Sequence, residues 1–210
     1  MGRYIGPSCR LCRREGIKLM LKGARCETAK CPMERQWRNM PPGQHAWRRG
    51  RGSDYGLRLR EKQKLKRYYG VWEKQFMKYF HLAERTKGNT GAALLSLLER
   101  RLDNVIYKLG FAPSRAAARQ TLTHGHIYVN GRRVNVPSYM VKVGDKLSVK
   151  DCERSKKLIQ DRLEELGELH VQNWMTLDLT KLSAEIIAMP TRDDVTIPIE
   201  EQRIVELCSQ

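Results

Sequence analysis

The chain has 210 residues, enough for one large or two modest domains, and carries 40 Lys and Arg against 23 Asp and Glu. The formal net charge of +17 is unevenly placed: residues 1–150 hold 33 Lys and Arg against 10 Asp and Glu, whereas residues 151–210 hold 7 against 13. This excess predicts a large polyanionic partner. No apolar run approaches the roughly 20 residues that span a bilayer, and the N-terminus lacks the apolar core of a signal peptide. We therefore expect a cytoplasmic protein with no membrane partner.

Four of the six cysteines form a C-x2-C pair and a C-x4-C pair separated by thirteen residues: Cys9, Cys12, Cys26 and Cys31. Two close pairs supply the four thiolates that Zn²⁺ takes in a tetrahedron, and the surrounding Lys and Arg favour the thiolate form. We predict one structural Zn²⁺, because four protein ligands leave no open position for a substrate. An iron–sulfur cluster and four unrelated free thiols are the alternatives.

Residues 41–52 form a linker rich in Pro and Gly that carries Arg48, Arg49 and Arg51. Trp47 in this linker could stack on a base or pack as an ordinary apolar residue. A helix is predicted from Tyr55, with Glu61 as the only acid among its many cations. We favour RNA contact over a merely solvated helix. The cations chosen as candidates there are Arg58, Lys62, Lys64, Lys66 and Arg67. A second helix is predicted after Gly70, and the residues predicted to be buried are Tyr69, Trp72, Phe76 and Phe80.

Residues 99–136 predict two short helices that lead into a tight hairpin. Apolar residues at helical spacing indicate a first helix that ends at Gly110, and Ser114 is a good N-cap for the second. Asn130-Gly131 is a two-residue turn of the type that hairpins prefer. Cations around a rigid helix pair and a hairpin tip suit a phosphate backbone, which indicates an RNA-binding module. Its candidate residues are Arg100, Arg115, Arg119, His124, Asn130, Gly131, Arg132 and Arg133.

Beyond the module we predict a strand–turn–strand over 141–149, a helix over 153–167, a strand over 173–179 and a short helix over 199–207. No nucleophile–base pair or phosphate loop is present, and Asp103 is expected to form a salt bridge with a neighbouring arginine, so we predict no enzyme. An RNA-modifying enzyme such as a pseudouridine synthase would need a separate catalytic domain, and none is recognisable. A zinc-finger DNA binder would need a helix beside the metal that enters the major groove and contacts the bases.

An ordered set of short motifs runs along the chain: Arg3-Tyr-Ile-Gly-Pro7, Pro42-Gly-Gln-His45, Ser53-Asp-Tyr-Gly56, Leu59-Arg-Glu-Lys-Gln-Lys64, Lys87-Gly-Asn-Thr-Gly91, Arg101-Leu-Asp-Asn-Val105, Val129-Asn-Gly-Arg132 and Ile204-Val-Glu-Leu207. With these motifs the chain resembles bacterial small-subunit ribosomal protein four, and the cysteines resemble the zinc-binding branch of that family. The pattern departs from the family at Ala46-Trp47 and over residues 182–200.

The resemblance implies an α+β protein with three parts. These are a zinc-bearing segment (1–46), a helical domain (47–97, completed by 182–210) and an inserted α/β RNA-binding domain (98–181). It implies a structural protein of the small ribosomal subunit that binds the 5′ domain of 16S ribosomal RNA early in assembly. It also implies contacts with ribosomal protein five and with other small-subunit proteins. Arg48, Arg49 and Arg51 would contact mRNA where it enters the subunit, and the protein would influence translational accuracy.

Overall fold

The computed structural model describes residues 2, 4–46, 52–167 and 171–209. The chain divides into two compact units, one made of Met1–Leu94 and Thr196–Gln210 and the other of Leu95–Val195. We call these unit 1 and unit 2 and describe each by itself. In the described ranges the chain forms helices and one antiparallel sheet, which confirms the predicted α+β class. Among the described helices, none combines the length and the apolar character that crossing a bilayer would take.

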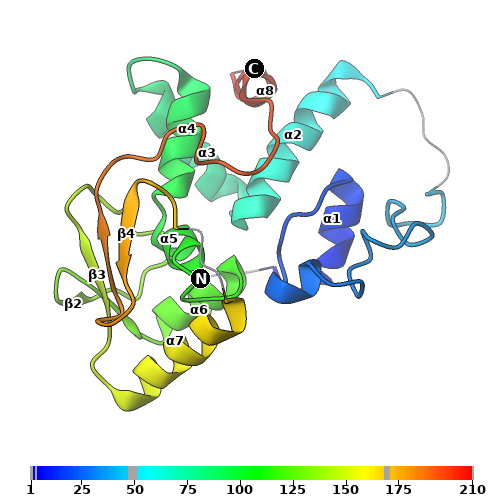
Figure 1. The fold of residues 1–210 in the computed structure, drawn as a ribbon. Coiled ribbons are helices and arrows are strands. Elements are labelled where there is room, and N and C mark those ends of the chain that lie inside the picture. The colour runs from blue at the N-terminus through cyan, green and yellow to red at the C-terminus, as the bar shows by residue number, and fades with distance from the viewer. Residues whose placement is uncertain (1, 3, 47–51, 168–170, 210) are drawn as a thin grey trace. The chain divides into compact units, whose positions relative to one another are not determined.

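Unit 1 is helical, and its C-terminal helix α8 (Glu201–Cys208) packs against α2 (Asp54–Tyr69) (Figure 1). Its other elements are α1 (Cys9–Glu15), the short 3-10 helix η1 (Gly23–Cys26), α3 (Glu73–Glu84) and the first half of α4 (Thr90–Glu99). The predicted start of α2 is confirmed, because Ser53 Oγ accepts a hydrogen bond from Gly56 N at 3.1 Å. Gly70, at a φ of +61°, ends the helix.

The aromatic residues predicted to be buried at the end of α2 and after it form part of the core of unit 1, with one exception. Tyr69, Phe76 and Phe80 are buried as predicted, but Trp72 is 52% exposed. Trp72 has extended backbone angles and immediately precedes α3, so it lies outside the helical face that carries Phe76 and Phe80. Its indole Nε1 donates to Gly2 O at 2.9 Å. The prediction that Trp72 is a core residue is therefore wrong.

Unit 2 is a five-stranded antiparallel sheet packed against short helices. The helices are α5 (Leu102–Lys108), α6 (Arg115–Thr123) and α7 (Glu153–Leu166). The strands are β1 (Ile127–Val129), β2 (Arg132–Arg133), β3 (Lys146–Val149), β4 (Met175–Asp178) and β5 (Ser183–Ile186), in the order β2-β1-β3-β5-β4. Residues from the helices and from the inner face of the sheet share one apolar core, which includes Val105, Leu122, Leu147 and Ile159. This core packs α5, α6 and strand β1 of the β1–β2 hairpin together.

Three predictions about local structure are corrected. The single helix expected to end at Gly110 is broken, because Arg101 is extended (φ −65°, ψ 133°) and forms a bridge with Met140. Of residues 141–149, only the second half is a strand, since the chain turns before Lys146. Strand β5 was not predicted at all. Its pairing with β3 and β4 places residues 183–186 in the sheet, so unit 1 resumes at Thr196 and not at the predicted position 182.

Candidate nucleic-acid interface

The tip of the β1–β2 hairpin is fixed by its backbone and by the side chain of Asn130. Asn130 and Gly131 have φ values of +50° and +75°, the positive angles that a type I′ turn requires. Asn130 Nδ2 donates to Asp145 Oδ1 at 2.8 Å, and Asn130 Oδ1 accepts from Lys146 N at 2.9 Å. Asn130 thus has a structural part in holding the tip that its predicted role in RNA binding did not include.

Arg132 and Arg133 are exposed on β2, directly after this turn. Neither forms an ion pair with a carboxylate among the described residues. The Arg133 guanidinium lies against Gly125, where any Cβ would clash with it. Gly125 therefore allows the hairpin to lie beside the end of α6, where His124 is exposed. The hairpin and this helix end present a single surface with cations available to a ligand.

Arg115 and Arg119, both chosen from the sequence as candidate RNA-binding residues, do not project together from α6 into solvent. Arg115 is only 5% exposed; its Nε donates to Asn104 Oδ1 at 2.8 Å, and its guanidinium lies 4.6 Å from the centre of the Tyr107 ring. Because its polar group is engaged within unit 2, Arg115 joins α5 to α6 rather than projecting to solvent. The N-cap of α6 is confirmed, with Ser114 Oγ accepting from Ala117 N.

Asp103 is a buried carboxylate shared by two arginines. Its Oδ2 accepts from Arg101 Nη2 at 2.8 Å and from Arg119 Nε at 2.7 Å, and its Oδ1 accepts from Arg101 Nε at 3.1 Å. This confirms the expected salt bridge. It also holds Arg119 in place, with 18% of that side chain exposed. Arg100 is likewise engaged, since its Nε donates to Val141 O at 2.9 Å.

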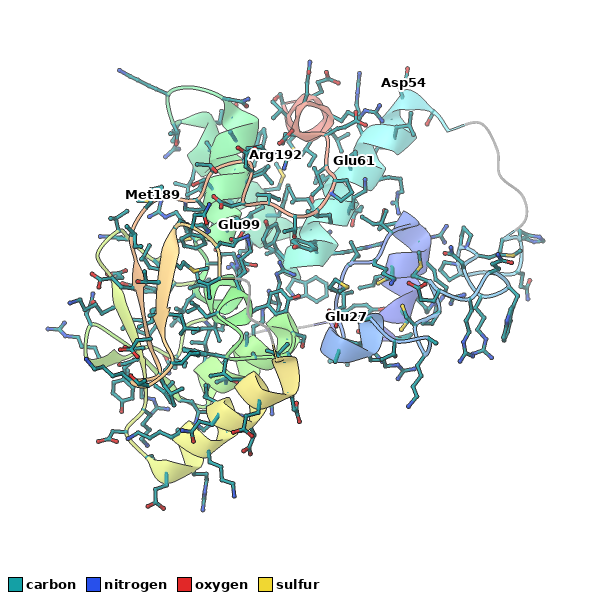
Figure 2. The ribbon with its side chains drawn as sticks, viewed as in Figure 1. Glu27, Asp54, Glu61, Glu99, Met189 and Arg192 are labelled. Carbon is teal, nitrogen blue, oxygen red and sulfur yellow. The ribbon has the colours of Figure 1, made fainter. Side chains whose placement is uncertain are left out.

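The cations predicted on α2 are paired with carboxylates of unit 1. Glu73 accepts from both Lys62 and Lys66, and burial, which raises the pKa of the Glu73 carboxyl, is outweighed by these two partners, so that its pKa is lowered. Arg67 and Arg60 both contact the Glu15 carboxylate, which is inaccessible to solvent. Arg58 binds Glu206 of α8 at 3.0 Å, and Lys64 binds Glu61, labelled in Figure 2. These cations therefore tie α1, α3 and α8 to α2.

The four cysteines of the N-terminal segment lie near one another. Figure 2 shows yellow sulfur atoms beside α1 and near the labelled Glu27. Burial raises the pKa of the Cys12 thiol, and repulsion from Cys26, Cys9 and Cys31 raises it further, which requires these groups to be close. Cys26 Sγ accepts from Lys22 N at 3.4 Å. As the side chains stand, no group of three or more potential ligands in the described residues is arranged to hold a metal ion.

Several positions bear on the site without having been chosen from the sequence. Asp145 and Gly125 shape the hairpin surface, and Glu15 and Glu73 form ion pairs with the cations of α2. A glycine between a helix end and a basic hairpin was the one available signal for Gly125. The acids gave no such signal, because their partners lie on other elements. Arg48, Arg49, Arg51 and Trp47 lie outside the described residues.

Comparison with known proteins is decisive at this point. Residues 3–99 match the model of the ribosomal protein S4/S9 N-terminal domain, and residues 100–147 match that of the S4 domain. Small ribosomal subunit protein uS4 of Halothermothrix orenii is 54% identical over 210 residues, and the match covers the whole of both chains. The chain belongs to the uS4 family. The proteins of the same name from Caldicellulosiruptor bescii and Thermus thermophilus are 54% and 53% identical, again over the full length of both chains.

Membership of the uS4 family confirms the resemblance seen in the sequence and the prediction that the chain is not an enzyme. The S4 domain match begins at Arg100 and ends at Leu147, so it contains α5, α6 and the β1–β2 hairpin. The surface formed by the hairpin and the end of α6 therefore lies within the matched domain.

Proposed function

We propose that this uS4-family chain, a structural protein of the small ribosomal subunit, is a primary binder of the 5′ domain of 16S ribosomal RNA that helps to nucleate subunit assembly. The observation that carries this proposal is the exposed, carboxylate-free pair Arg132 and Arg133 on a rigid hairpin within the S4 domain. Its mechanism is neutralisation of phosphates by fixed cations, with recognition of the shape of folded RNA rather than of a duplex sequence.

The RNA surface proposed here is centred on unit 2. His124, Arg132 and Arg133 are exposed, and Asn130 and Gly131 hold the tip that presents them. Arg119 stands at the margin, since part of its side chain is exposed while Asp103 holds its guanidinium. Arg115 supports the surface from within. The cations of α2 would contact RNA only where a phosphate can share them with their carboxylates.

The test is a salt-titrated binding assay with the full chain. It compares the 5′ domain of 16S ribosomal RNA with an unrelated folded RNA of equal length. We expect tighter binding to the ribosomal RNA, with a preference that persists as salt is raised. Equal affinities that fall together with salt would leave only non-specific phosphate binding and would refute the proposal.

We also propose that Cys9, Cys12, Cys26 and Cys31 bind one structural Zn²⁺. The support is the donor set itself, together with the closeness of the other three thiols to Cys12. Backbone amides that donate to the sulfurs, as Lys22 N does to Cys26, stabilise thiolates around a metal. The metal would fix the fold of this segment and would supply no reaction chemistry.

Elemental analysis of the purified chain tests the metal. We expect one zinc and no iron per chain, and a loss of zinc in Cys9→Ser with protease sensitivity confined to the N-terminal segment. Cys152→Ser is the matched control, because Cys152 is an exposed cysteine outside the quartet. Iron with sulfide would favour an iron–sulfur cluster instead, and the absence of any metal would refute the zinc proposal.

The resemblance supports two finer proposals. Arg48, Arg49 and Arg51 are proposed to contact mRNA where it enters the subunit and to influence translational accuracy, and the chain is proposed to contact ribosomal protein five. Chemical crosslinking of assembled subunits tests both. Crosslinks from residues 47–51 to mRNA are expected, as are crosslinks from this chain to ribosomal protein five. Crosslinks to other partners alone would contradict them.

A further inference from the structure

An exposed tryptophan lies in the segment that follows the last cysteine of the quartet. Trp37 is 66% exposed, and Met40 beside it is 49% exposed. The guanidinium of Arg38 lies over the indole, 4.2 Å from the ring centre. One face of the ring therefore carries a stacked cation, while most of the side chain remains open to solvent.

The backbone that carries Trp37 is held in place. Arg38 N and Asn39 N both donate to Arg35 O, at 2.9 and 3.0 Å, which closes a turn around Trp37. On the far side of the turn, Arg13 Nη1 donates to Met40 O and Arg14 Nη2 to Pro42 O, each at 3.4 Å. Since Arg13 and Arg14 lie in the last turn of α1, the helix that contains Cys9 and Cys12 also anchors the Trp37 turn.

The charge around Trp37 favours a nucleic acid over an apolar protein surface. Residues 8–46 contain nine Lys and Arg against three Asp and Glu. A protein that buried Trp37 and Met40 would also have to cover the neighbouring guanidinium of Arg38. An RNA strand suits both properties, because a base can stack on an aromatic ring while its phosphates attract the nearby cations.

We propose that Trp37 and Arg38 form a stacking site for an unpaired base of ribosomal RNA. The base lies on the open part of the indole, and Arg38 stays on the opposite face, where its charge is available to the adjoining phosphate. This inference rests on the proposed function and adds to it a base-stacking contact made by the cysteine-bearing segment. It makes the N-terminal segment a direct part of the RNA interface rather than only a structural support.

Fluorescence and affinity together test the stacking site. In a Trp47→Phe/Trp72→Phe background, the tryptophans that remain are Trp37 and the buried Trp174, so quenching on addition of the 5′ domain RNA reports Trp37. We expect clear quenching, and a loss of affinity of about 5- to 100-fold in Trp37→Ala. Because the lost contact is uncharged, the slope of affinity against salt should not change. Trp37→Phe should retain most of the affinity.

Trp72→Ala is the control, since it also removes a half-exposed tryptophan of unit 1 but one with no stacked arginine among the described contacts. Zinc content and the unfolding midpoint of each variant establish that the segment is intact. If the parent chain binds the RNA while Trp37→Ala binds within twofold of it and no quenching occurs, the stacking site is refuted. Quenching only by other small-subunit proteins would also refute it, in favour of a protein contact. If the parent itself shows no preference for the ribosomal RNA, it is the proposed function that fails.

Discussion

Helix α2 and the β1–β2 hairpin are both rich in cations, yet they use them differently. Lys62, Lys66 and Arg67 of α2 are bound by carboxylates from α1 and α3, whereas Arg132 and Arg133 of the hairpin have no carboxylate partner among the described residues. A phosphate that approaches α2 must compete with these carboxylates, but at the hairpin it displaces only water and counterions. The sequence therefore shows where Lys and Arg are dense. Which of these cations can bind a phosphate depends on the carboxylates that the fold brings next to them.

The largest effect is expected from removing the free cations of the hairpin. The double variant Arg132→Gln/Arg133→Gln should lose more than about 100-fold in affinity for the 5′ domain RNA, if each arginine makes one charged hydrogen bond. The slope of log affinity against log salt should become shallower by about 1.4–1.8. Filter binding at several salt concentrations measures both. Arg154→Gln/Lys157→Gln on α7 is the matched control, since both side chains are exposed, and an equal loss there would show that the effect is one of net charge.

The second prediction concerns Asp103, a carboxylate that pairs with two arginines in the interior of unit 2. Asp103→Asn removes the charge between Arg101, which is 1% exposed, and Arg119. Because a buried cation then loses its counter-charge, we expect unit 2 to lose about 3–5 kcal/mol of unfolding free energy. Urea unfolding followed by circular dichroism measures this, with Asp151→Asn as a control at an exposed pair. A loss below about 1 kcal/mol would mean that the network contributes little to stability.

The paired cations of α2 should behave in the opposite way to those of the hairpin. Lys62→Gln/Lys66→Gln breaks both contacts with Glu73 and should reduce stability by about 0.2–1 kcal/mol per pair. RNA affinity should change less than threefold, because these charges are already neutralised. The same unfolding and filter-binding assays apply. A loss of affinity as large as that of the hairpin variant would show that RNA displaces Glu73, and the contrast between the two regions would disappear.

The smallest expected effect is the pH dependence of stability that comes from His126, the residue immediately before β1. Burial lowers the pKa of His126, as do the charges of His124, Arg162 and Lys150, and its Nδ1 lies 2.9 Å from Ser155 Oγ. A lowered histidine pKa means that the unfolded chain takes up the proton first. The stability that His126 contributes is therefore complete above the unfolded pKa of about 6.5 and is lost as pH falls through the lower folded value. Unfolding between pH 7.5 and 5 should show this decline, and His126→Gln should flatten it. Equal slopes would contradict the assignment.

The predicted helix caps and hairpin turn, which depend on a few adjacent residues, agree with the structure. Ser53 and Ser114 cap α2 and α6, and Asn130-Gly131 has the positive φ angles of its turn. Each of these features depends on hydrogen bonds or steric limits within a few positions of the chain. Strand β5 went unpredicted because its alternation of polar and apolar residues runs over only four positions, Ser183–Ile186, and β3 and β4 pair with it on either side.

The sequence by itself determined the family, the elements with clear caps and turns, and the placing of the positive charge in the first 150 residues. Only the tertiary structure decided which cations face solvent. Arg67 meets Glu15 from 52 positions away, and Arg115 turns inward to Asn104 from 11 positions away. The physical reason is range: caps and turns are settled by adjacent backbone groups, whereas the partner of a charge is set by packing that brings distant segments together.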